Sequence, residues 1–313
     1  MALRIFFATD IHGSDKCWMK FINSGKFYNA SILVLGGDIT AKGFVALIEQ
    51  PDGKFKTNFR GKDLVVQPGK ELDELEKMIR FSGLYTYRTT PRELESLKSE
   101  TRREELVLQL ALESVERWMR IADERLEERD TKLFLTAGND DPFQIDSVLK
   151  KARSVVDVEG KVILLDEDHE MISTGYGNIT PWKCPRDVPE EDLAGRIDAM
   201  ASQVKNMANC IFNLHVPPYD SRLDDAPELD KELKPTYGAS KLVPVGSIAV
   251  RTAIEKYQPL LALHGHVHES KGTCKINRTL CLNPGSTYTD GILQGLLIEI
   301  DKKGVKSFTP TSG

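Results

Sequence analysis

Five short runs of apolar residues stand out along the chain, at residues 4–9, 32–37, 133–138, 210–214 and 259–263. Continuous hydrophobicity of this length, rich in Ile, Val, Leu and Phe, is typical of strands that are covered on both faces. Residues 21–30, after the first run, read as the end of a helix. The pattern therefore predicts alternating strands and helices near the N-terminus, as in an α/β fold.

The pattern changes in the second half of the chain, where residues 161–174, 272–283 and 294–309 are typical of β-hairpins. Turns are predicted at residues 166–168, 277–278 and 302–304. Antiparallel pairing is thus expected beside the parallel strands. A pair of sheets with helices on the outside accommodates both kinds of pairing.

Residues 41–131 differ from the rest of the chain. A Pro51-Asp52-Gly53 turn predicts a hairpin over 44–59, and residues 69–81 and about 91–129 are charged, almost free of glycine and predicted to be helical. Apolar residues recur in the second helix at spacings of three and four, which predicts one buried face; they are Val107, Leu110, Ala111, Trp118, Ile121 and Ala122. We expect a single domain over 1–313, with 41–131 as an inserted hairpin and helical layer on the core. A lid over a substrate, or a dimer arm, is the alternative.

Composition and charge place the chain among ordinary globular proteins. Its 313 residues are 40% hydrophobic and 28% charged, enough to bury a sizeable core. The net charge of -5 gives no basic patch for nucleic acid or anionic lipid, which disfavours a polynucleotide without excluding it. The first apolar run is too short for a signal peptide and no segment has the roughly 18 apolar residues of a membrane span, so a cytoplasmic protein is expected. Five scattered cysteines predict reduced thiols.

Each of the five apolar runs is followed by a side chain that can bind a metal ion. In chain order these are Asp10 and His12, then Asp38, Asn139 and His215, and finally His266 and His268. Ligand sites in open α/β sheets gather at the carboxyl ends of the strands. The seven side chains are therefore predicted to meet at one rim.

The chemistry of these donors indicates the kind of metal. A mixed nitrogen and oxygen set suits Mn, Fe, Zn or Co and suits calcium poorly, because calcium prefers oxygen ligands alone. Seven donors are too many for one ion, since a catalytic zinc takes three protein ligands. Two divalent ions that share one carboxylate are the economical interpretation, and Asp38 is the predicted bridge.

The ordered set of motifs resembles the five sequence blocks of the calcineurin-like metallophosphoesterase superfamily. The blocks span residues 10–268 and read Asp10-Ile11-His12, Gly37-Asp38, Gly138-Asn139, His215 and Gly265-His266-Val267-His268. The resemblance implies a four-layer αββα sandwich of two mixed β-sheets flanked by helices, here with a helical insertion, around a dinuclear metal centre. It also implies a partition of ligands, with one metal on Asp10, His12, Asp38 and His268 and the other on Asp38, Asn139, His215 and His266.

With two adjacent ions bound, the expected reaction needs no side-chain nucleophile. They lower the pKa of a bridging water to give hydroxide, hold the phosphoryl oxygens for in-line attack, and offset the charge of the transition state. The chain has no G-x-S-x-G, H-E-x-x-H or Walker A motif that would indicate another chemistry. A metal-dependent phosphoesterase is expected, acting on a small phosphorylated substrate or a phosphodiester.

The third block departs from the family pattern. Many members carry a histidine after its Gly-Asn, where it orients phosphate and helps to protonate the leaving group; here Asp140 follows Asn139. An aspartate with a pKa of about 3.9 is ionised at pH 7 and is a poor general acid unless burial raises that pKa. Its charge repels a dianionic monoester more than a monoanionic diester, so a preference for diesters is predicted. The alternative is that Asp140 points away and a water protonates the leaving group.

Four further residues are expected to have mainly structural roles. Asp141 followed by Pro142 is typical of a helix N-cap. His264 is expected to pack or to form a hydrogen bond near the ligands, and His169 to lie on the solvated surface. Trp182 can stack on a substrate base or pack, and packing is favoured.

The loop at 216–245 directly follows His215 and is rich in Pro and Asp. Long loops beside a site often shape the substrate pocket. Arg222 is the candidate phosphate contact in this loop, which also contains Tyr219, Tyr237 and Lys241.

Two other functions stay open at this point. A phosphomonoesterase such as a nucleotidase is the alternative within the enzyme class. A protein-interaction scaffold is the alternative from another class, because the retromer complex uses a related fold with a degraded metal site to bind partners. The seven ligand types are all present here, which argues against the scaffold. The native metal, manganese among the candidates, and any homo-oligomer are left open by the sequence.

Overall fold

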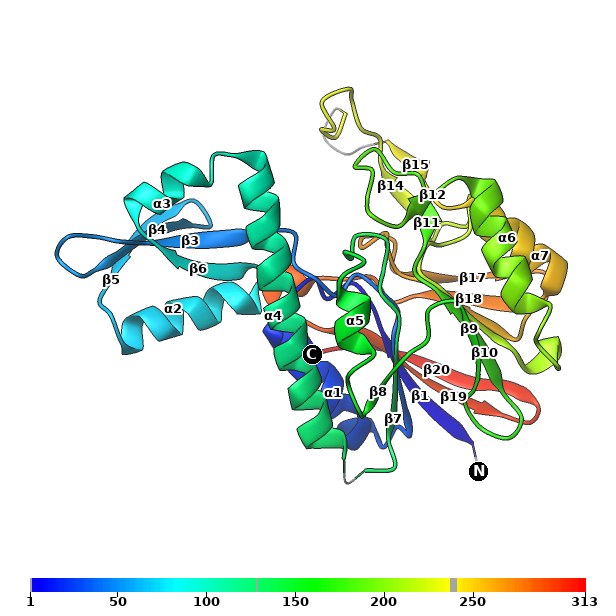
Figure 1. The fold of residues 1–313 in the computed structure, drawn as a ribbon. Coiled ribbons are helices and arrows are strands. Elements are labelled where there is room, and N and C mark those ends of the chain that lie inside the picture. The colour runs from blue at the N-terminus through cyan, green and yellow to red at the C-terminus, as the bar shows by residue number, and fades with distance from the viewer. Residues whose placement is uncertain (1, 128, 237–240) are drawn as a thin grey trace.

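Two six-stranded mixed sheets form the centre of the molecule, and Figure 1 shows them in the computed structural model, which describes residues 2–127, 129–236 and 241–313. The first sheet has the order β20 (Gly304–Ser312), β19 (Gln294–Asp301), β1 (Leu3–Ala8), β2 (Ile32–Leu35), β7 (Lys132–Leu135) and β8 (Val155–Asp157). The second has the order β17 (Gly272–Ile276), β18 (Thr279–Asn283), β16 (Leu261–Leu263), β13 (Ile211–Leu214), β10 (Glu170–Thr174) and β9 (Lys161–Leu164).

Each sheet combines parallel strands with the predicted hairpins. The strands β1, β2, β7 and β8 are parallel neighbours, as are β10, β13, β16 and β18. The hairpins β9–β10, β17–β18 and β19–β20 supply the antiparallel edges. The five apolar runs and the three hairpins were therefore correctly predicted as strands.

Helices cover the outer face of each sheet. On the first lie α1 (Asp15–Tyr28), α4 (Glu100–Leu126) and α5 (Ile145–Leu149); on the second lie α6 (Glu190–Ala201) and α7 (Ile248–Tyr257). Ser14 caps α1 and Ser247 caps α7, each by accepting a hydrogen bond from a backbone N–H three residues later. The architecture is the predicted αββα sandwich.

Alternation along β1 shows how the layers are built. Phe6 and Ala8 point outward into the core beneath α1 and α4, whereas Ile5 and Phe7 point inward. The inward residues meet side chains of the second sheet, such as Leu263, in a separate apolar layer. Because both faces of the strand are buried, its sequence shows a continuous apolar run without polar alternation.

Residues 44–96 form a small lobe with its own sheet, to the left in Figure 1. Its strands are β5 (Lys62–Val66), β4 (Phe55–Phe59), β3 (Phe44–Glu49) and β6 (Tyr85–Thr89), in that order, and its helices are α2 (Lys70–Phe81) and α3 (Pro91–Ser96). The Pro51-Asp52-Gly53 turn joins β3 to β4 where the sequence placed it, but β5 and β6 were not predicted. The lobe has a separate apolar core that includes Leu47, Leu72 and Ile79.

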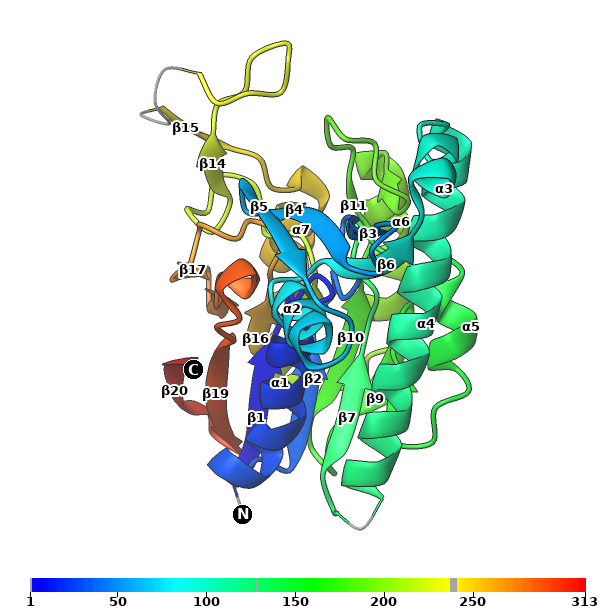
Figure 2. The same cartoon turned by 90° about the vertical axis from the view of Figure 1, so that its left-hand side faces the viewer.

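The long helix α4 links this lobe to the sandwich, as Figure 2 shows from the side. Trp118 of α4 stacks on Trp18 of α1, with ring centroids 5.0 Å apart and ring planes 4° from parallel. The expected helix over 91–129 is interrupted, because α3 ends at Ser96 and α4 begins at Glu100. Trp118, Ala111 and Ala122 are buried as predicted, but Val107, Leu110 and Ile121 are half-buried.

Two small ribbons rise from one end of the sandwich (Figures 1 and 2). One pairs β11 (Gly177–Asn178) with β12 (Asp187–Val188), and the other pairs β14 (Asp225–Pro227) with β15 (Leu242–Pro244). Short 3₁₀ turns lie at Met207–Asn209 and Tyr288–Asp290. Within the described residues, no helix has the length and apolar character needed to cross a membrane.

Candidate metal centre

The seven predicted ligands come together, but from two sheets rather than from the rim of one. From the loops after β1, β2 and β7 of the first sheet come Asp10, His12, Asp38 and Asn139; from the loops after β13 and β16 of the second come His215, His266 and His268. The expectation of one open rim was therefore incomplete. The strand ends of two facing sheets supply the site, which explains why its residues are spread over most of the chain.

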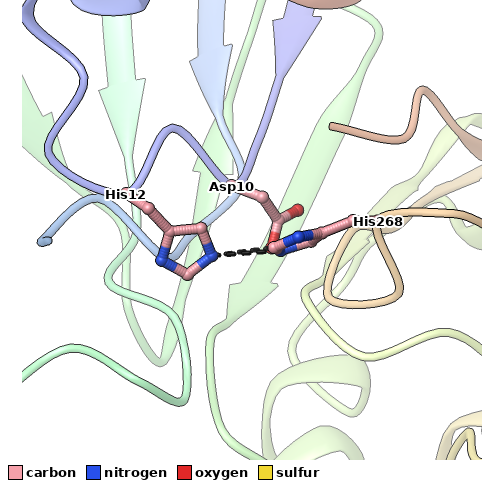
Figure 3. Close-up of side chains that lie close together, drawn as sticks. All are labelled: Asp10, His12 and His268. Atoms are coloured by element: carbon pink, nitrogen blue, oxygen red, sulfur yellow. Dashed lines mark hydrogen bonds and ion pairs between the residues drawn. The ribbon is translucent and has the colours of Figure 1, made fainter. Parts of the chain in front are cut away.

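Asp10, His12 and His268 form the first cluster (Figure 3). The Nε2 atoms of His12 and His268 lie 3.0 Å apart, with their rings turned toward one another. Oδ1 of Asp10 lies 3.4 Å from Nε2 of His268 and 3.9 Å from Nε2 of His12. One carboxylate and two imidazoles thus present their ligand atoms to a common point, where they can hold a metal ion.

Asp38, His215 and His266 form the second cluster. Oδ1 of Asp38 lies 3.4 Å from Nε2 of His215, and Oδ1 of Asn139 lies 3.0 Å from Nδ1 of His266. The Asn139 side chain is held by its amide, whose Nδ2 donates to Asp187 at 3.0 Å. Its oxygen is therefore directed toward the cluster.

Asp38 faces both clusters with different oxygen atoms. While Oδ1 approaches His215, Oδ2 lies 3.6 Å from Nε2 of His12 in the first cluster. The side chain is 4% exposed. This is the position that a bridging carboxylate between two ions requires.

The hydrogen bonding of His215 shows that the donors fit a cation. Its Nδ1 lies 2.9 Å from the carbonyl oxygen of Gly36, and because a carbonyl only accepts, this nitrogen carries the proton. In the neutral ring, Nε2 then presents a lone pair toward the carboxylates of Asp38 and Asp10, at 3.4 and 3.9 Å. This buried Nε2 has no hydrogen-bond partner among the described residues. A lone pair that faces two carboxylates is stabilised by a positive ion between them.

The pKa values show what the donors do without such an ion. Burial by itself lowers the pKa of His215, but the Asp38 carboxylate outweighs burial and raises it to about 10. A proton thus takes the place of the cation. Burial lowers the pKa of His12 and of His266 to about 4, so both rings are neutral and able to coordinate at pH 7. Burial by itself raises the pKa of Asp38, but His215 outweighs it and holds that pKa well below its usual range.

The backbone at the site is strained. Four of the seven predicted ligands have positive φ angles, which are uncommon for residues other than glycine: Asp10 (53°), His12 (37°), Asp38 (51°) and His266 (65°). Such conformations cost free energy and cluster at functional sites. The neighbouring glycines allow close approach, because a Cβ atom at Gly138 would overlap the Asp38 carboxylate and one at Gly265 would overlap the Asp10 carboxylate.

Asp140 faces the centre, which contradicts the alternative that it points away. One of its oxygens lies within 4.8 Å of ligand atoms of His12 and Asp38. Oδ2 pairs with Nζ of Lys42 at 2.5 Å, and Oδ1 accepts a hydrogen bond from the Cys184 thiol at 2.9 Å. Burial is the largest influence on Cys184 and raises the pKa of its thiol to about 12, so the thiol keeps the proton that it donates. Nothing in the sequence pattern indicated Lys42, a lone lysine in a connecting segment.

Asp141 is structural, but the prediction of a helix N-cap was wrong. The nearest helix, α5, begins four residues later at Ile145. The fully buried carboxylate instead accepts hydrogen bonds from the backbone N–H groups of Ile39, Thr40 and Gly138 at 2.8–3.1 Å. It ties the loop that carries Asp38 to the loop that carries Asn139.

Asp187 positions the Asn139 side chain, and this role was not predicted from the sequence. Asp187 accepts hydrogen bonds from Asn139, from the backbone and hydroxyl of Thr180, and from the backbone of Cys184. It therefore orients a predicted ligand and holds together the loop at 179–186. Asp187 lies in the two-residue strand β12, and no motif around it signals this role.

Of four predictions about single residues, one is confirmed, two are wrong and one has no structural support. His264 is buried outside both clusters and pairs through Nδ1 with the carbonyl of Leu214 at 2.8 Å, as expected. His169 is buried and paired with Asp166, so its assignment to the solvated surface was wrong. Trp182 is 62% exposed, so the favoured packing role was wrong. Arg222 is exposed and does not line the cavity at the site, and its phosphate contact stays a prediction without structural support.

A cavity of about 900 Å³ opens onto the clusters. Asp38, Asn139, His266 and His268 line its floor, and the loop at 216–245 contributes to its wall, as the sequence predicted. Tyr237 of that loop lies outside the described residues. The cavity gives a small molecule access to the predicted metal ligands.

Comparison with known sequences identifies no family. No protein-family model matches the chain. An uncharacterized protein of Methanocaldococcus jannaschii, MJ1162, is 29% identical over 149 residues, which are 47% of this chain and 61% of that relative. This chain thus matches about three fifths of the relative's length.

Solved structures share the fold at low sequence identity. One crystal structure superposes with a TM-score of 0.56 at 15% identity over 99% of both chains. TT1561 of Thermus thermophilus gives a TM-score of 0.52 at 13% identity, also over 99% of both chains. An archaeal phosphodiesterase gives a TM-score of 0.34 at 10% identity over 99% of this chain and 100% of its own, which is too weak to carry an argument. The first two matches establish a shared fold and nothing about activity.

Proposed function

We propose that the protein is a metal-dependent phosphoesterase with two divalent ions, and that it favours phosphodiesters. The observation that carries the proposal is the arrangement around Asp38, whose two oxygens face two separate histidine clusters. One ion would be held by Asp10, His12, Asp38 and His268, the other by Asp38, Asn139, His215 and His266. Mixed nitrogen and oxygen donors suit Mn, Fe, Zn or Co.

Bound there, two divalent ions would supply Lewis-acid activation of water and of the phosphoryl group. The chain itself does the positioning. Asp187 fixes the Asn139 amide, and Asp141 fixes the loops on which Asp38 and Asn139 lie. His268 is 27% exposed, so a substrate in the cavity reaches the cluster on its side.

The preference for diesters is supported by the few cationic side chains around the two proposed ions. Among the described residues that line the cavity, Lys42 is the one lysine or arginine, and Asp140 already neutralises it. A dianionic monoester needs more positive charge than a monoanionic diester, since its Coulomb energy scales with its charge. The 900 Å³ cavity also has room for the second organic group of a diester.

A phosphomonoesterase, such as a nucleotidase, is the second candidate, and Lys42 is the observation that favours it. Its ammonium group pairs with Asp140 and offsets the negative charge from which the sequence predicted a preference for diesters. If Lys42 turns from Asp140 to the substrate, it contributes a positive charge to the terminal phosphate oxygens.

Metal analysis combined with substitution tests the proposal. We expect about two Mn, Fe, Zn or Co ions per chain after reconstitution, and hydrolysis of bis(p-nitrophenyl) phosphate that a chelator abolishes. Asp38→Ala is expected to lose most of both ions and the activity, and His268→Ala to lose part of the metal. His169→Gln is the matched control, because His169 is a histidine away from both clusters. A wild-type protein with less than about one ion per chain and no hydrolysis would favour the interaction scaffold instead.

A further inference from the structure

The cavity at the metal centre continues into an apolar trough. Four exposed hydrophobic side chains line it, and they come from three separate segments: Ile179, Trp182, Tyr219 and Ile248. Their exposed fractions are 61%, 62%, 38% and 57%. Large apolar side chains gathered around one hollow, rather than scattered singly over the surface, indicate a binding site.

The trough offers little to a charged ligand. Lys42 is the one lysine or arginine among its described lining residues, and it lies at the metal end. Besides Asp38 and Asp140, the acidic side chains that line the cavity are Glu190, Glu228 and Glu269, of which Glu228 pairs with Lys241. Glu190 and Glu269 repel further phosphate groups, so a polyphosphate or a nucleic-acid strand is disfavoured along the trough.

The trough is built in advance of any ligand. Asp187 closes the loop that carries Ile179 and Trp182 through hydrogen bonds to Thr180 and Cys184. On the other wall, Glu190 accepts hydrogen bonds from Ser247 and from the backbone of Ile248 and Ala249, which holds the first turn of α7. Because the wall is fixed, an apolar group binds without the cost of ordering it.

We infer that the substrate is a monoanionic phosphate ester with an uncharged and largely apolar organic group, which lies in the trough with Trp182 against one of its faces. The inference rests on the proposed phosphoesterase function. It assigns the substrate class that the metal ligands alone leave open. The phosphoryl group lies at the clusters, and the organic group extends along Trp182 and Ile179.

A pair of diesters with the same leaving group tests the inference on the manganese-reconstituted protein. Methyl p-nitrophenyl phosphate and benzyl p-nitrophenyl phosphate carry the same charge and differ in the apolar group. We expect kcat/KM to be about tenfold higher for the benzyl ester, because part of its ring is removed from water in the trough. Thymidine 5′-p-nitrophenyl phosphate, with a large but polar group, is expected to be a poorer substrate than the benzyl ester.

Substitution of Trp182 locates the preference. Trp182→Ala is expected to reduce the benzyl-to-methyl ratio of kcat/KM to about threefold or less. Phe27→Ala is the matched control, since Phe27 is an aromatic residue of α1 that is 79% exposed and does not line the cavity, and it should leave the ratio unchanged. A wild-type ratio near one, a ratio that Trp182→Ala leaves intact, or a preference for the thymidine ester overturns the inference while hydrolysis itself upholds the phosphoesterase. No hydrolysis of any of the three esters overturns both.

Discussion

The pairing of Lys42 with Asp140 makes a quantitative prediction about substrate charge. The two charged groups are in contact, so a phosphate at the clusters experiences nearly no net charge from them. Lys42→Gln leaves one negative charge and Asp140→Asn leaves one positive charge. The double variant is neutral again, like the wild type.

The size of the effect follows from the distances at the site. A carboxylate oxygen of Asp140 lies within 4.8 Å of ligand atoms of His12 and Asp38. A unit charge about 5 Å from the phosphate, at an effective dielectric constant of about 40, contributes about 1.7 kcal/mol per unit of substrate charge. The Lys42 and Asp140 side chains are 55% and 21% exposed, so solvent screening reduces this to about 1.4 kcal/mol, a factor of about ten.

The assay is the ratio of kcat/KM for p-nitrophenyl phosphate, as the dianion, to kcat/KM for bis(p-nitrophenyl) phosphate. Lys42→Gln should lower this ratio about tenfold, Asp140→Asn should raise it about tenfold, and the double variant should return it close to the wild-type value. Lys54→Gln, which removes a lysine paired with Asp52 in the inserted lobe, is the control. Equal changes for both substrates in both single variants would refute the charge argument, because a loss of positioning or of proton transfer affects both esters alike.

Three further predictions concern the metal centre and the fold. Asp187→Asn should lower metal affinity about 10–100-fold, measured by competition with a chelator, because the Asn139 amide loses the carboxylate that orients it. Metal binding should release at least one proton per chain and strengthen as pH rises towards 10, because the metal-free site holds a proton on His215 whose pKa is about 10; calorimetry in buffers of different protonation enthalpy counts the protons. Trp118→Ala should lower the free energy of unfolding by about 3–5 kcal/mol in urea denaturation, because it removes a stacked and buried indole that joins α4 to α1.

A specific result would contradict each of these three predictions. Unchanged affinity in Asp187→Asn would mean that Asn139 is not a ligand or needs no support. Binding without proton release would mean that His215 is neutral in the metal-free protein. A loss below about 1 kcal/mol in Trp118→Ala, comparable with that of the exposed Arg120→Ala, would mean that α4 is only loosely attached.

The sequence predicted most of the fold because both faces of the central strands are buried. That burial leaves uninterrupted apolar runs, and the residue after each run lies at a strand end by necessity. Asp10, Asp38 and His215 could therefore be located from the pattern alone. The strands β5 and β6 were missed because they lie on the small inserted sheet, where one face is solvated and the apolar pattern is weak.

Residues whose role depends on a partner far along the chain could not be predicted in this way. Lys42 meets Asp140, and Asp187 meets Asn139, only after folding. Asp141 was taken for a cap because local chemistry favours that role, yet the strand ends beside it supply three N–H groups. Trp182 was expected to pack because apolar residues usually do, but the trough leaves it exposed.

The division of the predicted ligands between two sheets has a mechanical consequence. Asp10, His12, Asp38 and Asn139 belong to one half of the sandwich, and His215, His266 and His268 to the other. A pair of bound ions would cross-link the two halves of the sandwich, because each ion would bind side chains from both sheets. Such a cross-link forms only after both sheets have formed and packed together, because neither half holds a complete set of donors. The metal would then be selected by the folded protein. Removing it would weaken the contact between the two sheets at this end, while the apolar layer between them still holds the rest of the sandwich together.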